Sequence, residues 1–288
     1  MLILLISFFI LIFLRVPVAI SLALSTIFVL LMIDFNMDMM PQRMFTALDS
    51  FPMMAIPGFV FAGAIMARGG ISKYLIEALR SWVGHLPGGL SVVTLLACGI
   101  FAAISGSSPA TAAAIGSIMI PALISAGYDK KYALGLVAAG GTLGILIPPS
   151  VPLIIYGIVS EESIGKLFMA GVIPGLGLLA VLIAAAIIYA KMQGYKGDVK
   201  ATWGERGRKS LKAIWGAFLP VLILGTIYTG VVTPTESAVI AIVYGLIVSI
   251  FIYRELTWKD FRHVVVESIN VTAMIFLIIG AASLFGLY

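Results

Sequence analysis

Apolar residues along this chain occur in runs long enough to cross a lipid bilayer, separated by short polar segments. The pattern predicts helices throughout. In the first part the predicted elements are two short helices (2–14 and 18–33) joined by a turn at Arg15-Val16-Pro17, an amphipathic arm in the interface (34–50), a span (51–67) and a polar connection (68–86). The later elements are a broken apolar segment (88–127), a broken span (130–160), a span (165–190), a charged stretch (191–212), two spans (213–231 and 238–253), a second amphipathic arm (255–270) and a final span (271–288).

The segment 88–127 is interpreted as a re-entrant hairpin. As one straight helix its roughly 40 residues would be about 60 Å long, twice the thickness of the bilayer core. The run Ser105-Gly106-Ser107-Ser108-Pro109 interrupts it near its middle. Two half-length helices that meet at this run, with both outer ends on one membrane face, fit the length.

A second interruption lies in the span 130–160, where glycines are followed by Pro148-Pro149-Ser150. Irregular backbone at membrane depth is tolerated only where it lines a cavity or is packed against protein. We therefore expect the two breaks to face each other near the midplane. Tight packing between helices is the alternative explanation for so many Gly, Ser and Thr residues.

The residue types in the two breaks suit a hard cation such as Na⁺, which prefers oxygen ligands. Ser105, Ser108 and Thr111 supply hydroxyls, and prolines after Gly144 remove amide donors and so free carbonyls. Other residues have structural roles: a positive φ at the tip, the first turn of the returning helix, and close approach of the backbone. These are Gly106, Pro109, Gly140, Gly141 and Pro148. Neither break contains a charged residue.

Composition and charge agree with a membrane protein. Hydrophobic residues make up 61% and charged residues 11%, with a mean hydropathy of +1.14. On the predicted topology every lysine and arginine except Arg43 and Lys166 lies on one face, which the positive-inside rule assigns to the cytoplasm. The net charge of +5 is therefore explained by membrane orientation and lipid contact, without nucleic acid. The single cysteine, Cys98, is expected to be a buried, inert thiol.

The order of elements in the first part recurs near the end of the chain. A turn, a span, an arm and a span follow Arg15, and the same order follows Thr233, pointing the opposite way across the membrane. This is an inverted repeat, a feature of secondary transporters. The hairpin and broken span of the second copy do not follow before Tyr288, so the second repeat is expected to be incomplete and completed by another segment or chain. The rival interpretation is that the repeat is illusory and the chain complete.

On this pattern the chain divides into four parts. Residues 1–87 are predicted to form the first helices and the interfacial arm of the first repeat, and residues 88–160 the re-entrant hairpin and the broken helix. Residues 161–212 are predicted to form a spanning helix and a cytoplasmic basic loop, and residues 213–288 the start of the second repeat. Glu236 lies at membrane depth, but Thr233-Pro234-Thr235-Glu236 also matches a helix capping box, which is the favoured role.

Several motifs together resemble the large membrane subunit of tripartite ATP-independent periplasmic (TRAP) transporters, the DctM family. The stretches that carry the likeness are Phe101–Ala113, Gly127-Tyr128-Asp129, Ala139–Ser150 and Thr233–Ala238, and it extends along the whole chain. The resemblance implies an all-α, inverted-repeat elevator transporter in the bacterial inner membrane that takes up a small organic acid with Na⁺ as the coupling ion. It further implies that the helices of residues 1–87 belong to a scaffold and that the hairpin and broken helix of residues 88–160 belong to a transport domain. Two partners are also implied, a small four-span membrane subunit and a periplasmic solute-binding protein. The family's large subunit has a second hairpin and broken span, which this sequence lacks.

Carried over by motif, the resemblance assigns Na⁺ ligands and neighbouring groups. The Na⁺ ligands are Ser105, Ser108, Gly144, Ile147 and Pro149, and the groups with substrate or supporting roles are Ser107, Thr111 and Thr142. Two alternatives remain open. One is a related organic anion transporter that acts without a binding protein. The other is an intramembrane hydrolase using Ser107 or Ser108, which is disfavoured because His85 and His263 both lie in polar segments.

Overall fold

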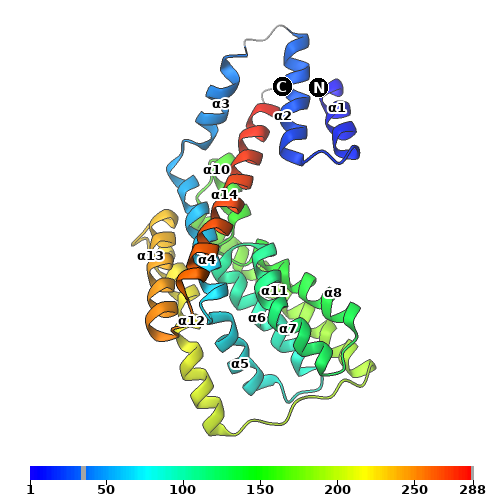
Figure 1. Ribbon diagram of the computed structural model, residues 1–288, viewed down its shortest axis with the longest axis vertical. Coiled ribbons are helices and arrows are strands. Elements are labelled where there is room, and N and C mark those ends of the chain that lie inside the picture. The colour runs from blue at the N-terminus through cyan, green and yellow to red at the C-terminus, as the bar shows by residue number, and fades with distance from the viewer. Residues whose placement is uncertain (34–36, 287–288) are drawn as a thin grey trace. The chain divides into compact units, whose positions relative to one another are not determined.

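The computed structural model describes residues 1–33 and 37–286, and it is helical, with no β-strand among these residues (Figure 1). The helices form two compact units, which are described separately. Unit 1 comprises Met1–Met53 and Ile269–Tyr288, and unit 2 comprises Met54–Ser268. Within the described residues, seven helical segments are long and apolar enough to cross a membrane. The sequence-based prediction of an all-α polytopic membrane protein is confirmed.

Unit 1 is built from α1 (Leu2–Phe13), α2 (Val18–Met32), α3 (Met39–Leu48) and the later part of α14 (Trp258–Phe285). Leu30, Met40 and Leu284 form a small buried core, and the rings of Phe8 and Phe285 make an edge contact. Residues 34–36 of the predicted arm and 287–288 of the predicted final span lie outside the described residues.

Unit 2 contains the two breaks that the sequence singled out. Its elements are α4 (Ala55–Arg68), which follows the 3₁₀ turn η1 (Phe51–Met54), then α5 (Ile71–Val83), α6 (Gly89–Ser105), α7 (Ser108–Ser125), α8 (Lys130–Gly141), α9 (Leu143–Leu146), α10 (Val151–Val159), α11 (Ile164–Met192), α12 (Trp203–Tyr228), α13 (Pro234–Ile247), the π-helix η2 (Val248–Ile252) and the start of α14.

The segment 88–127 is a helical hairpin, as predicted. Helix α6 runs to Ser105 and α7 returns from Ser108. Their outer ends lie together: the hydroxyl of Tyr132, in the first turn of α8 that follows the hairpin, donates to Ser91 Oγ in the first turn of α6 at 3.0 Å. A single continuous crossing would separate these two ends by the full length of the segment.

Two segments of unit 2 contain helices that the sequence analysis did not predict. The polar connection 68–86 includes the amphipathic helix α5, formed by Ile71–Val83. Ile71, Leu75 and Ile76 share its buried face, which packs on α12 with Gly216 against Ile71. The charged stretch 191–212 is also partly helical, since α12 begins at Trp203 behind a capping box from Thr202.

The second amphipathic arm and the final span form one continuous helix, α14, rather than two elements. In the first part, by contrast, the turn η1 separates α3 from α4. The polar residues of 255–270 do not stop the helix because they lack the Pro and Gly that end most helices. The Thr233–Glu236 capping box at the start of α13 is confirmed, with Glu236 Oε2 accepting from the Thr233 amide at 2.7 Å.

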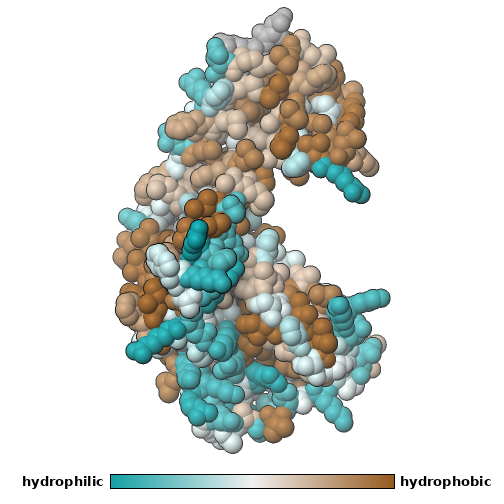
Figure 2. Space-filling view, viewed as in Figure 1, coloured by the Kyte–Doolittle hydropathy of each residue, from teal (hydrophilic) through white to brown (hydrophobic). Residues whose placement is uncertain are grey.

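At one end of unit 2, polar contacts join the basic segments to one another. Hydrophilic surface is concentrated at this end in Figure 2. Arg80 of α5 pairs with Asp198 in the loop before α12 at 2.5 Å. The Asp129 amide donates to the Tyr195 hydroxyl, which ties the end of the hairpin to the same loop. These contacts agree with the single basic face that the charge pattern predicts.

The membrane orientation can be tested at the two ends of α11, whose 29 residues span about 43 Å. In a Cys98→Ala background, we expect an impermeant maleimide added to intact spheroplasts to label Glu162→Cys but not Lys196→Cys. Lysed membranes should label both positions and so provide the control. Labelling of Lys196→Cys in intact spheroplasts would reverse the assigned orientation.

Candidate functional site

The hairpin tip is shaped by local backbone chemistry. Helix α6 ends because Gly106 adopts a left-handed conformation with φ of +60°, which residues with a side chain rarely adopt. Ser107 then caps α7, its hydroxyl accepting from the Ala110 amide at 3.5 Å. Pro109 occupies the first turn of α7, where its missing N–H has no helical partner to lose.

Hydrogen bonds of buried hydroxyl groups hold the two sides of the hairpin tip together. Ser105 Oγ and Thr111 Oγ1 lie 2.9 Å apart, and Thr111 Oγ1 donates to the Ser107 carbonyl at 2.8 Å. Ser105 and Thr111 are 1% and 0% exposed, so these bonds are shielded from solvent. Thr111 therefore has a structural role at the tip, and the substrate or supporting role assigned from the sequence stays a prediction.

The broken span runs through α8, α9 and α10, with Ile147 in an extended conformation between α9 and the two prolines. Pro148 and Pro149 have no N–H, so the carbonyls of Gly144 and Ile145 lack the amide that would bond them in a continuous helix. The Ser150 hydroxyl donates to the Ile145 carbonyl at 2.5 Å and replaces that bond. The Gly144 carbonyl keeps its acceptor capacity.

The two breaks are in direct contact, as the sequence predicts. A Cβ on Gly144 would lie 2.7 Å from the Ser107 carbonyl and 2.8 Å from the Ser108 amide nitrogen. The Val151 amide donates to the Gly106 carbonyl at 3.0 Å, which fixes the tip to the start of α10. We call the contact between residues 105–111 and 144–151 the break junction.

Four helix ends meet at the break junction. Helices α6 and α9 point their C-terminal ends toward it, and α7 and α10 begin there. C-terminal ends carry partial negative charge and N-terminal ends partial positive charge. With no charged side chain in either break, these partial charges dominate the local field, and they can stabilise a cation and an anion side by side.

The predicted residues do not all lie in the break junction. Gly141 faces Ala112 of α7, and Gly140 faces Cys98 of α6, so both allow close packing of α8 on the hairpin. Ile147 belongs to the break junction by its backbone, but its side chain is buried against α11, where a Cβ on Gly175 would lie 2.8 Å from Ile147 Cγ1. Thr142 is exposed and its hydroxyl bonds the Ala139 carbonyl of its own helix. A substrate role for Thr142 remains a prediction.

Sequence reasoning missed the glycines that hold the surroundings of the break junction. A Cβ on Gly63 of α4 would lie 2.8 Å from the Cα of Ser105, and one on Gly171 of α11 would lie 2.7 Å from the Leu146 carbonyl. Gly171 and Gly175 form a Gly-x-x-x-Gly pattern, a known signal of close helix packing in membranes, which could have identified α11 as the neighbour.

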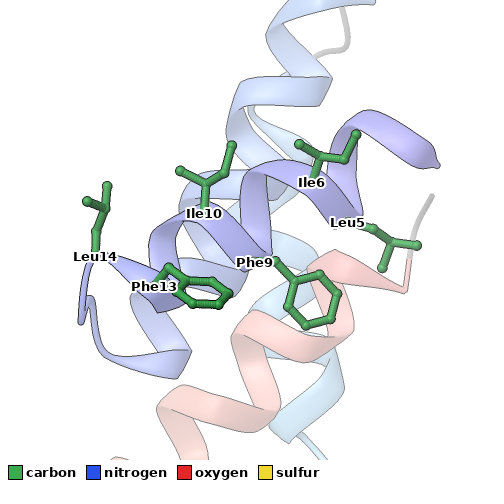
Figure 3. A pocket seen from close by; sticks show the side chains of 6 residues that line it. All are labelled: Leu5, Ile6, Phe9, Ile10, Phe13 and Leu14. Carbon is green, nitrogen blue, oxygen red and sulfur yellow. The ribbon is translucent and has the colours of Figure 1, made fainter.

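A pocket on α1 in unit 1 offers no comparable chemistry (Figure 3). Only apolar side chains line it, namely Leu5, Ile6, Phe9, Ile10, Phe13 and Leu14. Apolar side chains supply no ligand for an ion, so the break junction of unit 2 is the candidate functional site.

Comparison with known proteins identifies the family. The sequence model of the family described as "Tripartite ATP-independent periplasmic transporter, DctM component" matches residues 5–288. The chain belongs to this family. DctM components are parts of transporters and not enzymes. With seven span-length helical segments among its described residues, this DctM chain is a multi-pass protein of the bacterial inner membrane.

The DctM chain is similar to permeases with different named substrates. The isethionate TRAP transporter permease protein DctMQ of Oleidesulfovibrio alaskensis is 43% identical over 94% of the chain and 43% of the relative. The C4-dicarboxylate TRAP transporter large permease protein DctM of Rhodobacter capsulatus is 40% identical, over 93% and 64% respectively. The sialic acid TRAP transporter permease protein SiaT of Haemophilus influenzae is 36% identical, over 96% and 45%. The chain thus spans less than two thirds of each of these relatives.

The contact at Gly144 gives a direct test of the break junction. We expect Gly144→Val to destabilise the protein by about 1–3 kcal/mol, because its side chain must displace the Ser107–Ser108 backbone. Gly177→Ala on α11 is the matched control, since nothing lies within 4 Å of its Cβ. The temperature of thermal unfolding in detergent should fall only for Gly144→Val. Equal unfolding temperatures of the two variants would contradict the contact between Gly144 and the hairpin tip.

Proposed function

We propose that this DctM chain contributes to Na⁺-coupled uptake of a small organic acid, with the break junction as part of the ion and substrate site. The observation that carries the proposal is the contact of two irregular backbone segments inside an apolar helical unit. At membrane depth such backbone is favourable only where it is packed or binds something.

The ligand set supports a hard monovalent cation. Carbonyl and hydroxyl oxygens are the groups present, and Ser105, Ser108, Gly144, Ile147 and Pro149 are the proposed sources. The Gly144 carbonyl has no helical amide partner because residue 148 is proline. The C-terminal ends of α6 and α9 add negative potential without a buried carboxylate.

The same geometry suits an anionic substrate. The first turns of α7 and α10 begin at the break junction and carry donor amides. An ion bound beside them would add positive charge for a carboxylate. The substrate class is thus a small organic acid, such as a C4-dicarboxylate or sialic acid, which are substrates named for similar permeases.

We further propose the assembly and the motion that the family implies. A small membrane subunit would extend the scaffold, and a periplasmic binding protein would deliver the substrate. An elevator step requires the hairpin and broken helix to move as one body. The hydrogen bond from Val151 to Gly106 and the glycine contacts between α7 and α8 support a single rigid element.

Serine substitutions on α7 test the ion site. We expect Ser108→Ala to raise the Na⁺ concentration for half-maximal uptake on the order of tenfold, because one oxygen ligand is lost. Ser117→Ala is the matched control: its hydroxyl is exposed and bonds only the Ala114 carbonyl of the same helix. Uptake in proteoliposomes is measured with K⁺ replacing Na⁺, and unchanged Na⁺ dependence of Ser108→Ala would reject the assignment.

Delivery by a binding protein is tested separately. Proteoliposomes that contain the intact permease should accumulate substrate only when the purified periplasmic binding protein is present outside. Accumulation at the same rate without it would favour a transporter that acts alone. The Na⁺ titration above distinguishes a failed delivery step from a failed ion site.

A further inference from the structure

A groove at the basic end of unit 2 joins cationic side chains to aromatic and aliphatic surface. It is formed by α5, α12 and the end of η2, which are far apart in sequence. We call it the interface groove, and its lining residues are Tyr74, Arg208, Leu211, Lys212, Trp215, Ile252 and Tyr253. None of these residues belongs to the break junction.

The interface groove lies where the charged part of each helix gives way to the apolar part. In α12 the last charged residue is Lys212, and the apolar stretch 213–228 spans about 24 Å, close to the bilayer core. In the α13 region the apolar run ends at Tyr253, followed by Arg254. The Tyr253 hydroxyl donates to the Lys212 carbonyl at 2.5 Å, so both boundaries lie at one level. That level is the depth of the lipid headgroups.

Two positive charges in the interface groove are uncompensated. Arg208 and Lys212 lie one turn apart on α12, and neither is in an ion pair within the described part of the chain. Glu255, which contacts Tyr74 of the interface groove, is engaged elsewhere: it accepts from Lys73 Nζ at 2.8 Å and from the Tyr74 hydroxyl at 3.0 Å. The hydrogen bond to Glu255 raises the pKa of Lys73.

The walls of the interface groove are fixed in advance of binding. The rings of Tyr74 and Tyr253 lie 4.4 Å apart, and Lys212 Nζ lies 5.7 Å from the centre of the Tyr74 ring. Tyr244 also donates to α12, to the Trp215 carbonyl at 2.7 Å, beside the bond from Tyr253 to Lys212. A preformed groove loses little conformational entropy when a ligand binds.

We propose that the interface groove binds an anionic phospholipid. The phosphate diester would contact Arg208 and Lys212, and the upper part of an acyl chain would lie along Leu211, Trp215 and Ile252. Guanidinium and ammonium groups bind phosphate through charge-assisted hydrogen bonds, and tryptophan and tyrosine favour the headgroup level. A lipid matches both halves of the groove, because Leu211 and Trp215 are 69% and 45% exposed directly beside the two cations. This site is independent of the proposed ion site.

Trp215 provides a local reporter for the test. The intact protein, in its natural membrane assembly, is reconstituted into phosphatidylcholine vesicles that contain a minor fraction of dibrominated phosphatidylglycerol or dibrominated phosphatidylcholine. Bromine quenches indole fluorescence on contact, and the difference between wild type and Trp215→Phe isolates the signal of Trp215. We expect a preference for phosphatidylglycerol on the order of tenfold, since each nearby cation adds to the attraction of an anionic headgroup.

Two matched double variants separate a specific site from general surface charge. Arg208→Gln/Lys212→Gln should lose the preference, whereas Lys200→Gln/Lys209→Gln should keep it. The second pair removes the same charge from the same end of unit 2, but both residues line a different pocket beside Arg80. A competition experiment on the wild type needs no charge variant. Unbrominated phosphatidylglycerol should relieve the quenching by brominated phosphatidylglycerol, and unbrominated phosphatidylcholine should not.

Three results would overturn the proposal. Equal quenching by both brominated lipids would mean that the headgroup charge is not recognised. Equal loss in the two double variants would mean that only the overall surface potential matters. Displacement of brominated phosphatidylglycerol from Trp215 by millimolar soluble glycerol phosphate would identify a site for free anions rather than for lipid.

Discussion

Backbone groups that leave the helical hydrogen-bonding pattern inside an apolar protein must find other partners, and this requirement organises unit 2. An unpaired amide or carbonyl in hydrocarbon costs several kcal/mol. The hairpin tip and the broken span each contain such groups, and the structure sets them against one another. The Val151 amide bonds the Gly106 carbonyl, and the Ser150 hydroxyl bonds the Ile145 carbonyl. The hairpin tip is thus bonded to the broken span, and the broken span replaces one of its own missing bonds, while proline at position 148 leaves the Gly144 carbonyl without its helical partner.

Close approach is what makes this arrangement possible, and glycine supplies it at each contact. Gly144 meets the Ser107–Ser108 backbone, Gly63 meets Ser105, and Gly171 and Gly175 meet the residues around the double proline. A Cβ at any of these positions would lie less than 3 Å from a neighbouring atom, so any side chain there would force the segments to shift. The site therefore depends on backbone-to-backbone packing rather than on charged side chains, which agrees with the absence of charge from both breaks in the sequence.

At the basic end of unit 2, aromatic rings and cationic side chains lie together. Arg206 is 6% exposed, and its guanidinium carbon lies 5.3 Å from the centre of the Trp82 ring and 5.0 Å from that of the Trp203 ring. Its Nε donates to the Ser81 carbonyl near the end of α5 at 3.1 Å. Stacking on indole rings and the negative end of a helix both favour a guanidinium. The same mixture of aromatic and cationic groups recurs in the interface groove, so this end of the unit is suited to the chemistry of lipid headgroups.

The sequence by itself determined the class of protein, most helix boundaries, both breaks and the capping box at Thr233–Glu236, because these depend on local composition, proline, glycine and short-range hydrogen bonds. It also indicated the hairpin, because the segment is too long to cross the bilayer once. It did not reveal helix α5 or the continuity of α14, since moderate polarity does not distinguish a surface helix from a loop. Only the tertiary structure decided which glycine faces which backbone, that Gly63 and α11 enclose the break junction, and that α5, α12 and η2 meet in one groove. Those contacts join residues far apart in the chain, and their partners are selected by packing of whole helices, which no local pattern encodes.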